Sequence, residues 1–251
     1  MFDALIQDLA VDFALRRDVR SVFGEVDDLE DAYHIQDRLR PHLGAICGRK
    51  IAANSPALMT ALDMNVPIVG LITGQIAIPT RSELHLSDYA QLALEPEFAA
   101  VIGREVPPGT VLSTKILGDY VDRFSMAFEI LDCRNNMNSM HAPTFIVNNG
   151  FNAGVVLDNA AIDMDALDKK AFEATFKVGD KVMFANENNA PQNPLEACAF
   201  VINHFTARGE AVKVGEVILC GAHHPPTIVG DEGCYVFTLC SGEEVSLSIL
   251  R

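Results

Sequence analysis

Hydrophobic residues near the start of the chain follow a helical spacing. Between Phe2 and Leu43 they recur three or four positions apart, most clearly in DDLEDAYHIQDRLRPHL, so we expect helices there. The segment GAICGRKIAA, residues 44–53, is predicted as a strand. NSPALMTALDM is predicted as a short helix that is capped by Asn54 or Ser55 and has Pro56 in its first turn.

From Pro67 onward the pattern changes to short apolar runs separated by Gly, Pro and Asn, which is typical of strands. One helix, NPLEACAFVINHFTARG, interrupts this pattern, with Asn193 as its cap and Gly209 at its end. We therefore predict an α+β protein with a mixed, largely antiparallel β core. Residues 1–64 would form a helical segment packed on this core, and residues 65–251 a β-rich catalytic unit. The predicted strand segments are VGLITGQIAIP, LALEPEFAAVIG, FSMAFEILDCR, TFIVNNGFNAGVVLD, EVILCGA, CYVFTLC and EVSLSIL.

The run LALEPEFAAVIG places two carboxylates inside an apolar strand. Side chains alternate between faces along a strand, so Glu95 and Glu97 point to the same side. Like charges at this spacing repel each other unless water solvates both groups or a cation lies between them. From this run alone, a solvated sheet face remains the simpler alternative.

A third acid, Glu129, lies in the middle of FSMAFEILDCR, on the strand face with the smaller side chains. A solvated antiparallel face could also explain this position. If the three carboxylates converge, they form an all-oxygen site that suits Mg²⁺ or Mn²⁺ and leaves positions open for water and a chelating substrate.

Composition narrows the classes of function. The 251 residues carry a formal net charge of -15 and no basic run, which argues against binding to a phosphate backbone. The six cysteines show no CxxC spacing and are expected to be reduced. The N-terminal sequence resembles neither a signal peptide nor a membrane span, so a cytoplasmic protein without membrane or nucleic-acid partners is expected. No glycine-rich phosphate motif occurs.

Several segments, taken in order, resemble the 2-keto-4-pentenoate hydratase and 4-oxalocrotonate decarboxylase family of the fumarylacetoacetate hydrolase fold superfamily. The resemblance covers roughly residues 48–250. The E-P-E pair followed by a strand with E-x-x-D is its most specific part. The matching segments are GRKIAANSP, LEPEFAAVIG, FEILDCR, VNNGFNAG, NPLEA and VGEVILCGA.

The resemblance implies a core of the fumarylacetoacetate hydrolase type and one divalent metal ion, Mg²⁺ or Mn²⁺, held by Glu95, Glu97 and Glu129. It also places Lys50 of the G-x-K-I segment at the substrate as a catalytic residue. Without the resemblance, a lysine that extends from a strand end into solvent would be the simpler interpretation of Lys50.

The chain also departs from the family pattern. Asn148 precedes Asn149 where relatives often have an acid, and Gln75 stands near another usual acid. Both differences remove a possible proton carrier. His223 and His224 are expected in an exposed turn, with a catalytic role as the less favoured alternative. Asp132 and Arg134 could support the site or form a plain ion pair at a strand end.

These observations predict a hydro-lyase of aromatic-compound catabolism that adds water to a 2-hydroxy-2,4-dienoate or 2-oxo-4-enoate. A small 2-oxo acid would be its substrate, and a homo-oligomer is expected, with a complex with a related pathway enzyme left open. Decarboxylation of a dicarboxylic 2-oxo acid and a non-catalytic partner subunit are the alternatives. Because basic residues near the matched segments are few, mainly Arg49, Arg81 and Arg134, the sequence favours a substrate with one carboxylate.

Overall fold

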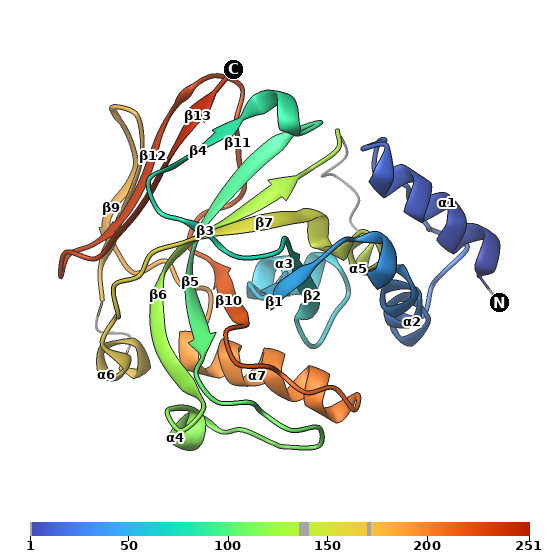
Figure 1. Ribbon diagram of the computed structural model, residues 1–251, viewed down its shortest axis with the longest axis horizontal. Helices are drawn as coiled ribbons and strands as arrows, with labels where there is room; N and C mark the ends of the chain where they lie inside the picture. Colours follow the sequence, from blue (N-terminus) through green and yellow to red (C-terminus); the bar gives the residue numbers. More distant parts are fainter. Residues whose placement is uncertain (1, 136–140, 170–171) are drawn as a thin grey trace.

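The computed structural model describes residues 2–135, 141–169 and 172–251. Within these ranges the chain forms two β-sheets with helices around them (Figure 1). The predicted α+β class, with a mixed core and helices at the N-terminus, is confirmed. The helices are α1 (Asp3–Ala14), α2 (Leu29–Leu39), η1 (Arg40–His42), α3 (Pro56–Ala61), η2 (Leu86–Asp88), α4 (Thr114–Leu117), α5 (Ala142–Val147), η3 (Asn149–Phe151), α6 (Met164–Asp168) and α7 (Pro194–Ala207).

The larger sheet has the strand order β2-β1-β10-β5-β6-β7-β3, and β11 also pairs with β5. The smaller sheet has the order β4-β13-β12-β8-β9. The strands are β1 (Ile46–Ala52), β2 (Ile68–Thr73), β3 (Ile78–Pro79), β4 (Ser82–His85), β5 (Leu92–Ile102), β6 (Val121–Asp132), β7 (Asn152–Leu157), β8 (Ala174–Val178), β9 (Lys181–Glu187), β10 (Val217–Ala222), β11 (Thr227–Ile228), β12 (Gly233–Leu239) and β13 (Glu244–Leu250).

The first strand lies inside the larger sheet. β1 pairs with β2 on one side and with β10 on the other, so residues 46–52 are part of the β core. The helices α1 and α2 lie at the side of the molecule near the N-terminus, next to α5 (Figure 1). The division of the chain at residue 64 stays a prediction, and β1 shows that its N-terminal part also supplies a sheet strand.

The two faces of β5 and β6 have different surroundings. The bulky residues Phe98 and Phe128 pack against Phe237 of the smaller sheet, with ring centroids 6.1 and 6.4 Å apart, and belong to the main core. The opposite face carries the acids and small residues such as Ala99 and Ala127. The alternation of side chains along these strands therefore gives one face that packs into the main core and an opposite face that carries the acids, which we call the inner face.

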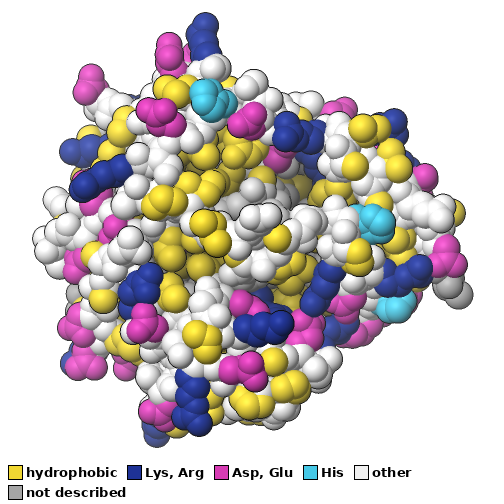
Figure 2. All heavy atoms as spheres, in the orientation of Figure 1, with side chains coloured by type: hydrophobic (Ala, Val, Ile, Leu, Met, Phe, Trp, Pro, Cys, Tyr) yellow, Lys and Arg dark blue, Asp and Glu magenta, His cyan; other side chains and the backbone are white. Residues whose placement is uncertain are grey.

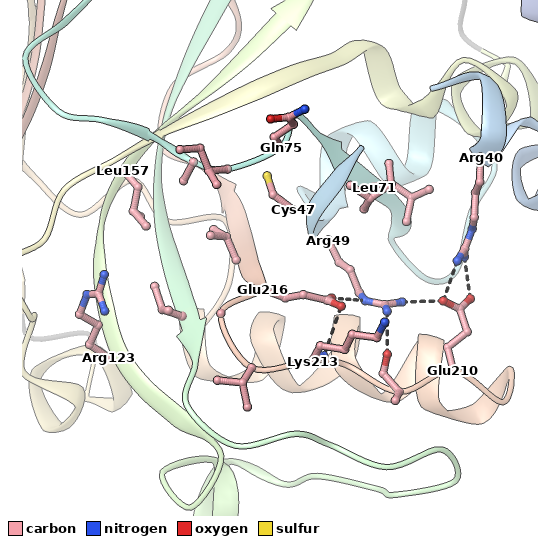
Figure 3. A pocket seen from close by; sticks show the side chains of 18 residues that line it. Arg40, Cys47, Arg49, Leu71, Gln75, Arg123, Leu157, Glu210, Lys213 and Glu216 are labelled. Atoms are coloured by element: carbon pink, nitrogen blue, oxygen red, sulfur yellow. Dashed lines mark hydrogen bonds and ion pairs between the residues drawn. The ribbon is translucent and has the colours of Figure 1, made fainter. Parts of the chain in front are cut away.

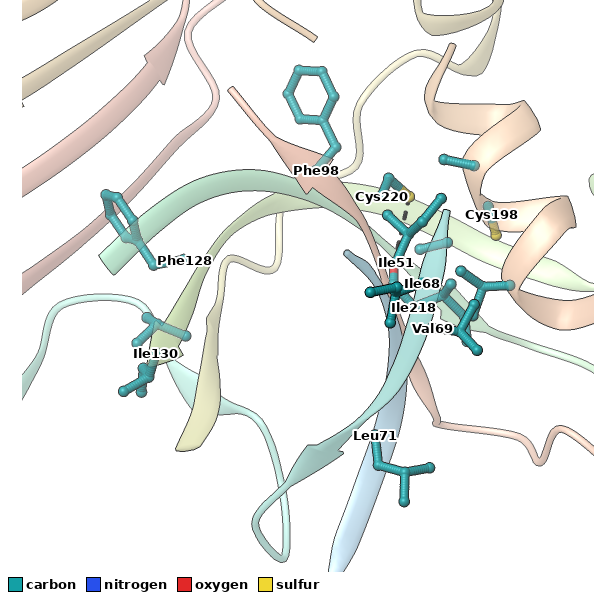
Figure 4. Close-up of a cluster of buried hydrophobic side chains, with 14 of the residues drawn as sticks. Ile51, Ile68, Val69, Leu71, Phe98, Phe128, Ile130, Cys198, Ile218 and Cys220 are labelled. Carbon is teal, nitrogen blue, oxygen red and sulfur yellow. Dashed lines mark hydrogen bonds between the residues drawn. The ribbon is translucent and has the colours of Figure 1, made fainter. Parts of the chain in front are cut away.

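The helix α7 covers the larger sheet near β1 and β10. Asn193 caps it by accepting hydrogen bonds from the backbone of Leu195 and Glu196, as predicted. Cys198 of α7 packs with Ile218 and Cys220 of β10 in the buried apolar cluster of Figure 4. All six cysteines are free thiols.

One predicted strand segment is wrong in its first half. TFIV belongs to the helix α5, and only the later part of that segment forms β7. A short apolar run fits a buried helix turn as well as a strand, and Pro143 in the first turn favours the helix. None of the helices in the described ranges combines the length and the apolar character that crossing a membrane requires.

Candidate metal centre

Antiparallel pairing brings the three predicted carboxylates together. β5 and β6 place Glu95 directly opposite Glu129, while Glu97 lies opposite Ala127 on the same inner face. One carboxylate oxygen from each acid lies within 4.8 Å of one from each of the other two. Three acids from two strands thus form one cluster, the arrangement that the family resemblance implied and that the strand pattern alone had left open.

The cluster is removed from solvent. Glu97 and Glu129 are each 1% exposed, and Glu95 is partly buried. Burial, reinforced by the charge of Glu129, raises the pKa of Glu95 to about 8. The same causes, with the charge of Glu95, raise the pKa of Glu97 well above its ordinary value. Without a cation, these carboxyls therefore tend to hold protons.

Lys50 is buried beside the acids and does not extend into solvent. Its side chain is 2% exposed, and its Nζ donates to Glu129 Oε1 at 2.5 Å and to the Gly150 carbonyl oxygen at 3.0 Å. Burial alone would lower the pKa of Lys50, but the charges of Glu129, Glu95 and Glu97 outweigh it and raise the pKa. Lys50 is thus held as a cation at the cluster.

Two glycines beside Lys50 leave room for its side chain because they have no Cβ atom. Gly70 is its partner residue on β2, and a Cβ there would lie 3.4 Å from the lysine Cε. Gly150 has a φ of +53°, and a Cβ there would lie 3.0 Å from Nζ. A side chain at Gly150 would therefore displace the ammonium group that its carbonyl oxygen binds.

Two further residues fix the carboxylates. The Gly221 backbone N–H donates to Glu97 Oε2 at 2.7 Å, and Asn152 Nδ2 donates to Glu129 Oε1 at 2.8 Å. Asn152 did not appear among the sequence predictions, although the polar cluster NNGFNAG inside an apolar run was a usable signal. Its amide is a supporting contact that orients a candidate metal ligand.

The donor set fits a divalent cation with oxygen ligands. Glu129 Oε2 is buried and has no hydrogen-bond partner among the described residues, so it retains free lone pairs. Mg²⁺ binds oxygens at about 2.1 Å, which puts ligands on opposite sides of the ion about 4 Å apart. Carboxylate oxygens within 4.8 Å of one another could reach that spacing by small side-chain rotations.

The two positions that depart from the family pattern have their described contacts elsewhere in the structure. Asn148 accepts a hydrogen bond from Arg134 at 2.6 Å and donates to the carbonyl oxygens of Arg20 and Thr144. Gln75 lines a separate cavity of about 710 Å³ (Figure 3). Neither amide has a described hydrogen bond to a carboxylate of the cluster.

This larger cavity lies near the C-terminal end of β5 and the N-terminal end of β10, where Val101 and Val217 line it. Val101, which lines it, is four residues from Glu97 and six from Glu95 along β5, or about 13 and 20 Å. Its most buried cation, Arg49, is already paired with Glu210 at 2.9 Å and Glu216 at 2.8 Å (Figure 3). In the space-filling view, hydrophobic side chains gather near the middle of this face of the molecule and charged side chains at its periphery (Figure 2).

The prediction of an exposed histidine turn is wrong for His223. This side chain is 4% exposed and packs between Phe98 and Phe237, with ring centroids 4.4 and 5.3 Å away. Its backbone N–H donates to the Pro96 carbonyl oxygen, which pulls the loop after β10 inward. His224 is only partly buried and stacks on Phe184.

Asp132 and Arg134 do not form an ion pair. The Asp132 carboxylate accepts hydrogen bonds from the backbone N–H groups of Ala90, Gln91 and Arg134. Arg134 is 3% exposed, and the structure shows no carboxylate within 4.0 Å of its guanidinium among the described residues.

No family model matches the chain. Among curated proteins it is 27% identical to 2-hydroxyhexa-2,4-dienoate hydratase of Comamonas testosteroni, over 81% of this chain and 80% of that protein. It is 24% identical to 4-oxalocrotonate decarboxylase of a Pseudomonas species, over 70% of this chain and 67% of that protein.

A solved structure of 4-oxalocrotonate decarboxylase from Pseudomonas putida G7, complexed with magnesium and adipate, shares the fold. Its TM-score is 0.84 at 18% identity, covering 98% of this chain and 96% of that one. The sequence matches and the common fold together extend over most of the chain. The protein is therefore a distant homologue, over most of its length, of the 2-hydroxydienoate hydratases and 4-oxalocrotonate decarboxylases, and it shares their fold, which is of the fumarylacetoacetate hydrolase type.

Proposed function

We propose that this protein is a metal-dependent hydro-lyase that adds water to a 2-hydroxy-2,4-dienoate. The observation that carries the proposal is the buried cluster of three carboxylates with a lysine cation at its edge, in a chain related to dienoate hydratases. Retention of all four groups favours an enzyme over a non-catalytic partner subunit.

Glu95, Glu97 and Glu129 would hold one divalent ion, Mg²⁺ or Mn²⁺. When bound, such an ion would act as a Lewis acid toward the substrate's carboxylate and 2-oxygen. The chain's own groups hold this arrangement in place, because the Gly221 N–H fixes Glu97 and the Asn152 amide fixes Glu129.

The reaction moves protons without any change in oxidation state. The dienol loses its 2-hydroxyl proton and gains a proton at the far end of the diene, which gives a conjugated unsaturated ketone. Water then adds its hydroxyl to the alkene carbon remote from the ketone and a proton to the nearer carbon. Lys50, held as a cation beside Glu129, would orient the substrate carboxylate or pass a proton, and its charge would stabilise the negative charge that develops.

Decarboxylation of a dicarboxylic 2-oxo acid is the second candidate. Its support is the sequence relationship to a 4-oxalocrotonate decarboxylase over 70% of this chain. Both reactions need the same stabilisation of an enolate, so the cluster by itself does not separate them.

The test uses purified protein that is stripped of metal and then titrated with Mg²⁺ in a calorimeter. We expect one ion per chain. The loaded protein should hydrate 2-hydroxypenta-2,4-dienoate and release little carbon dioxide from 2-oxohex-3-enedioate. Absence of Mg²⁺ and Mn²⁺ binding would contradict the metal centre, and faster release of carbon dioxide than hydration would establish the decarboxylase instead.

A further inference from the structure

The larger cavity, shown in Figure 3, has a volume of about 710 Å³ and lies at the end of the inner face that is remote from the carboxylate cluster. Arg123 lines it from β6 and is the direct partner of Val101 on β5. Arg123 shares the inner face of β6 with Glu129, because the two are six residues apart, or about 20 Å along the strand. A small molecule bound at Arg123 would therefore lie apart from the proposed metal centre.

Packed apolar side chains lie on the inner face between the cavity and the carboxylate cluster. Ala99, Ala127 and Leu219 belong to one buried cluster, and each of them is 0% exposed. Leu219 of β10 is the partner of Ala99, and Ala127 of β6 is the partner of Glu97. The cavity is therefore a site of its own rather than an extension of the metal centre.

The cavity has an apolar wall. Val101, Leu157 and Val217 line it, and all three belong to the same buried cluster or pack against it. At the mouth, the lining residues Ile76 and Val214 are exposed. A volume of about 710 Å³ is in the range of small-molecule pockets, and apolar walls with a few polar groups are typical of them. The wall can thus hold the apolar body of a ligand.

Most of the charged groups around the cavity neutralise one another. Arg49 pairs with Glu210 at 2.9 Å and with Glu216 at 2.8 Å, and Arg40 pairs with Glu210 at 2.6 Å. These two arginines and two glutamates form one connected network along one side of the cavity (Figure 3). The network carries no net charge, so the excess of positive charge in the lining comes from the cations outside it.

Arg123 is a cation outside the network, and it has unused hydrogen-bond donors. Its Nη1 donates to the exposed Asp122 carboxylate at 2.8 Å, and no described residue accepts a hydrogen bond from its Nε or Nη2. The pair with Asp122 is a surface ion pair, which contributes little. The Nε and Nη2 groups form the edge of a guanidinium that can bind both oxygens of one carboxylate. Lys213, the other cation, is exposed at the mouth.

Unpartnered guanidinium donors gather at this cavity. Four buried side-chain polar atoms lack a hydrogen-bond partner among the described residues, and two of them, Arg40 Nε and Arg123 Nε, belong to arginines that line it. A buried N–H group without an acceptor is destabilising. Arg40 is held by its ion pairs with Glu210 and Asp37, whereas rotation of Arg123 toward the cavity gives up only the Asp122 contact. Arg123 is therefore the group that an anionic ligand would satisfy.

We propose that the larger cavity binds the anion of a carboxylic acid with an apolar body, independently of the metal centre. Its carboxylate would bind the free edge of Arg123, and its apolar body would lie against Val101, Leu157 and Val217. A neutral molecule would leave Arg123 unpaired, and a multiply charged anion would meet the glutamates of the network. The site goes beyond the proposed function, because it uses none of the four groups at the metal centre.

The test titrates metal-free protein with hexanoate in a calorimeter, so that the probe has no Mg²⁺ to bind. We expect one hexanoate per chain and at least tenfold weaker binding of hexanamide, which lacks the charge, and of acetate, which lacks the apolar body. Arg123→Gln should weaken hexanoate at least tenfold. Arg104→Gln, which removes an exposed arginine that does not line the cavity, is the matched control and should bind hexanoate as the wild type does.

A second variant tests the apolar wall. Val101→Phe adds a ring to the wall beside Arg123 and should weaken hexanoate severalfold in a protein that circular dichroism shows to be folded. Absence of hexanoate binding, equal affinity for hexanamide, or unchanged affinity in either Arg123→Gln or Val101→Phe would overturn the proposal. Because these titrations contain no metal, their failure leaves the proposed function intact, and failure of Mg²⁺ binding or of hydration leaves this site intact.

Discussion

Lys50 and Glu129 form a buried ion pair that is expected to cost stability and that the proposed function would use. Both side chains leave water almost completely, and the attraction between two such charges rarely repays their desolvation. Here the lysine offsets part of the repulsion among three carboxylates, and Glu129 Oε2 stays available for another cation. The proposed metal centre therefore explains the pair better than a contribution to folding does.

The first prediction separates the roles of the two partners. Lys50→Met removes a cation next to the cluster, so Mg²⁺ should bind at least as tightly as in the wild type. Turnover should fall by about 10²–10⁴-fold, the usual contribution of a proton-transfer group. Glu129→Gln is the matched variant, and it should lose Mg²⁺ affinity and activity together. Calorimetry and hydration rates measure both quantities.

The metal-free Lys50→Met protein should also be less stable, by about 3–5 kcal/mol, because Glu129 loses its buried counter-charge. Its activity is therefore compared in saturating Mg²⁺, with folding checked by circular dichroism. Wild-type turnover in a folded, metal-loaded Lys50→Met protein would show that Lys50 has only a structural role.

At the scale of elements, hydrogen bonds from side chains, as well as those between paired strands, hold the strands of the larger sheet in place. β2 lies next to β7, although the two strands are not ladder partners. The Asn149 side chain connects this region to β2, because its Oδ1 accepts from the Leu71 N–H at 2.8 Å and its Nδ2 donates to the Leu71 carbonyl oxygen at 2.9 Å. The amide thus replaces the strand partner that Leu71 lacks on this side.

The second prediction concerns this connection. Asn149→Ala should lower the free energy of unfolding by about 2–4 kcal/mol, because both backbone groups of Leu71 lose a buried partner. Urea unfolding followed by circular dichroism measures the change. Asn186→Ala is the control, since Asn186 has a similar left-handed φ of 56° but is exposed, and its loss should be about 1 kcal/mol. Equal losses in the two variants would refute a special role for the Asn149 amide.

The sequence predicted the features that depend on local alternation. Glu95 and Glu97 share a face because strand side chains have a period of two, and the position of Glu129 in its strand followed from the same rule. Local patterns do not specify which distant segments meet, so the contacts of Asn152 with Glu129 and of Asn149 with Leu71 were not predicted. The short apolar run before Asn148 was ambiguous between helix and strand for the same reason.

At the scale of the whole molecule, the fold separates two environments along the inner face of one sheet. The carboxylate cluster lies in the first half and middle of β5, and the larger cavity lies near its end. The net charge of -15 repels anionic ligands at long range, so binding of a carboxylate substrate depends on local cations. Lys50 is the buried cation at the carboxylate cluster that can supply this attraction.

Global stability should depend on pH through His223. Burial among phenylalanines lowers the pKa of His223 to about 3, and its buried Nδ1 has no partner among the described residues. The folded protein therefore keeps His223 neutral at a pH where the unfolded chain, with a pKa near 6.5, binds a proton. The stability from this group is complete above pH 6.5 and is lost progressively as the pH falls toward 3.

The third prediction is that wild-type protein loses about 2 kcal/mol more stability than His223→Phe between pH 7 and pH 5, because each pH unit below 6.5 costs about 1.4 kcal/mol. Metal-free protein is used for both, and the free energy of unfolding is measured by urea titration at each pH. A general effect of net charge does not explain such a difference, since acid reduces the negative charge of both proteins alike. If packing of the larger phenyl ring perturbs the core, His223→Leu provides the same comparison. Parallel stability profiles for the wild type and both variants would show that the His223 ring takes up a proton without unfolding, and the argument from its burial would be wrong.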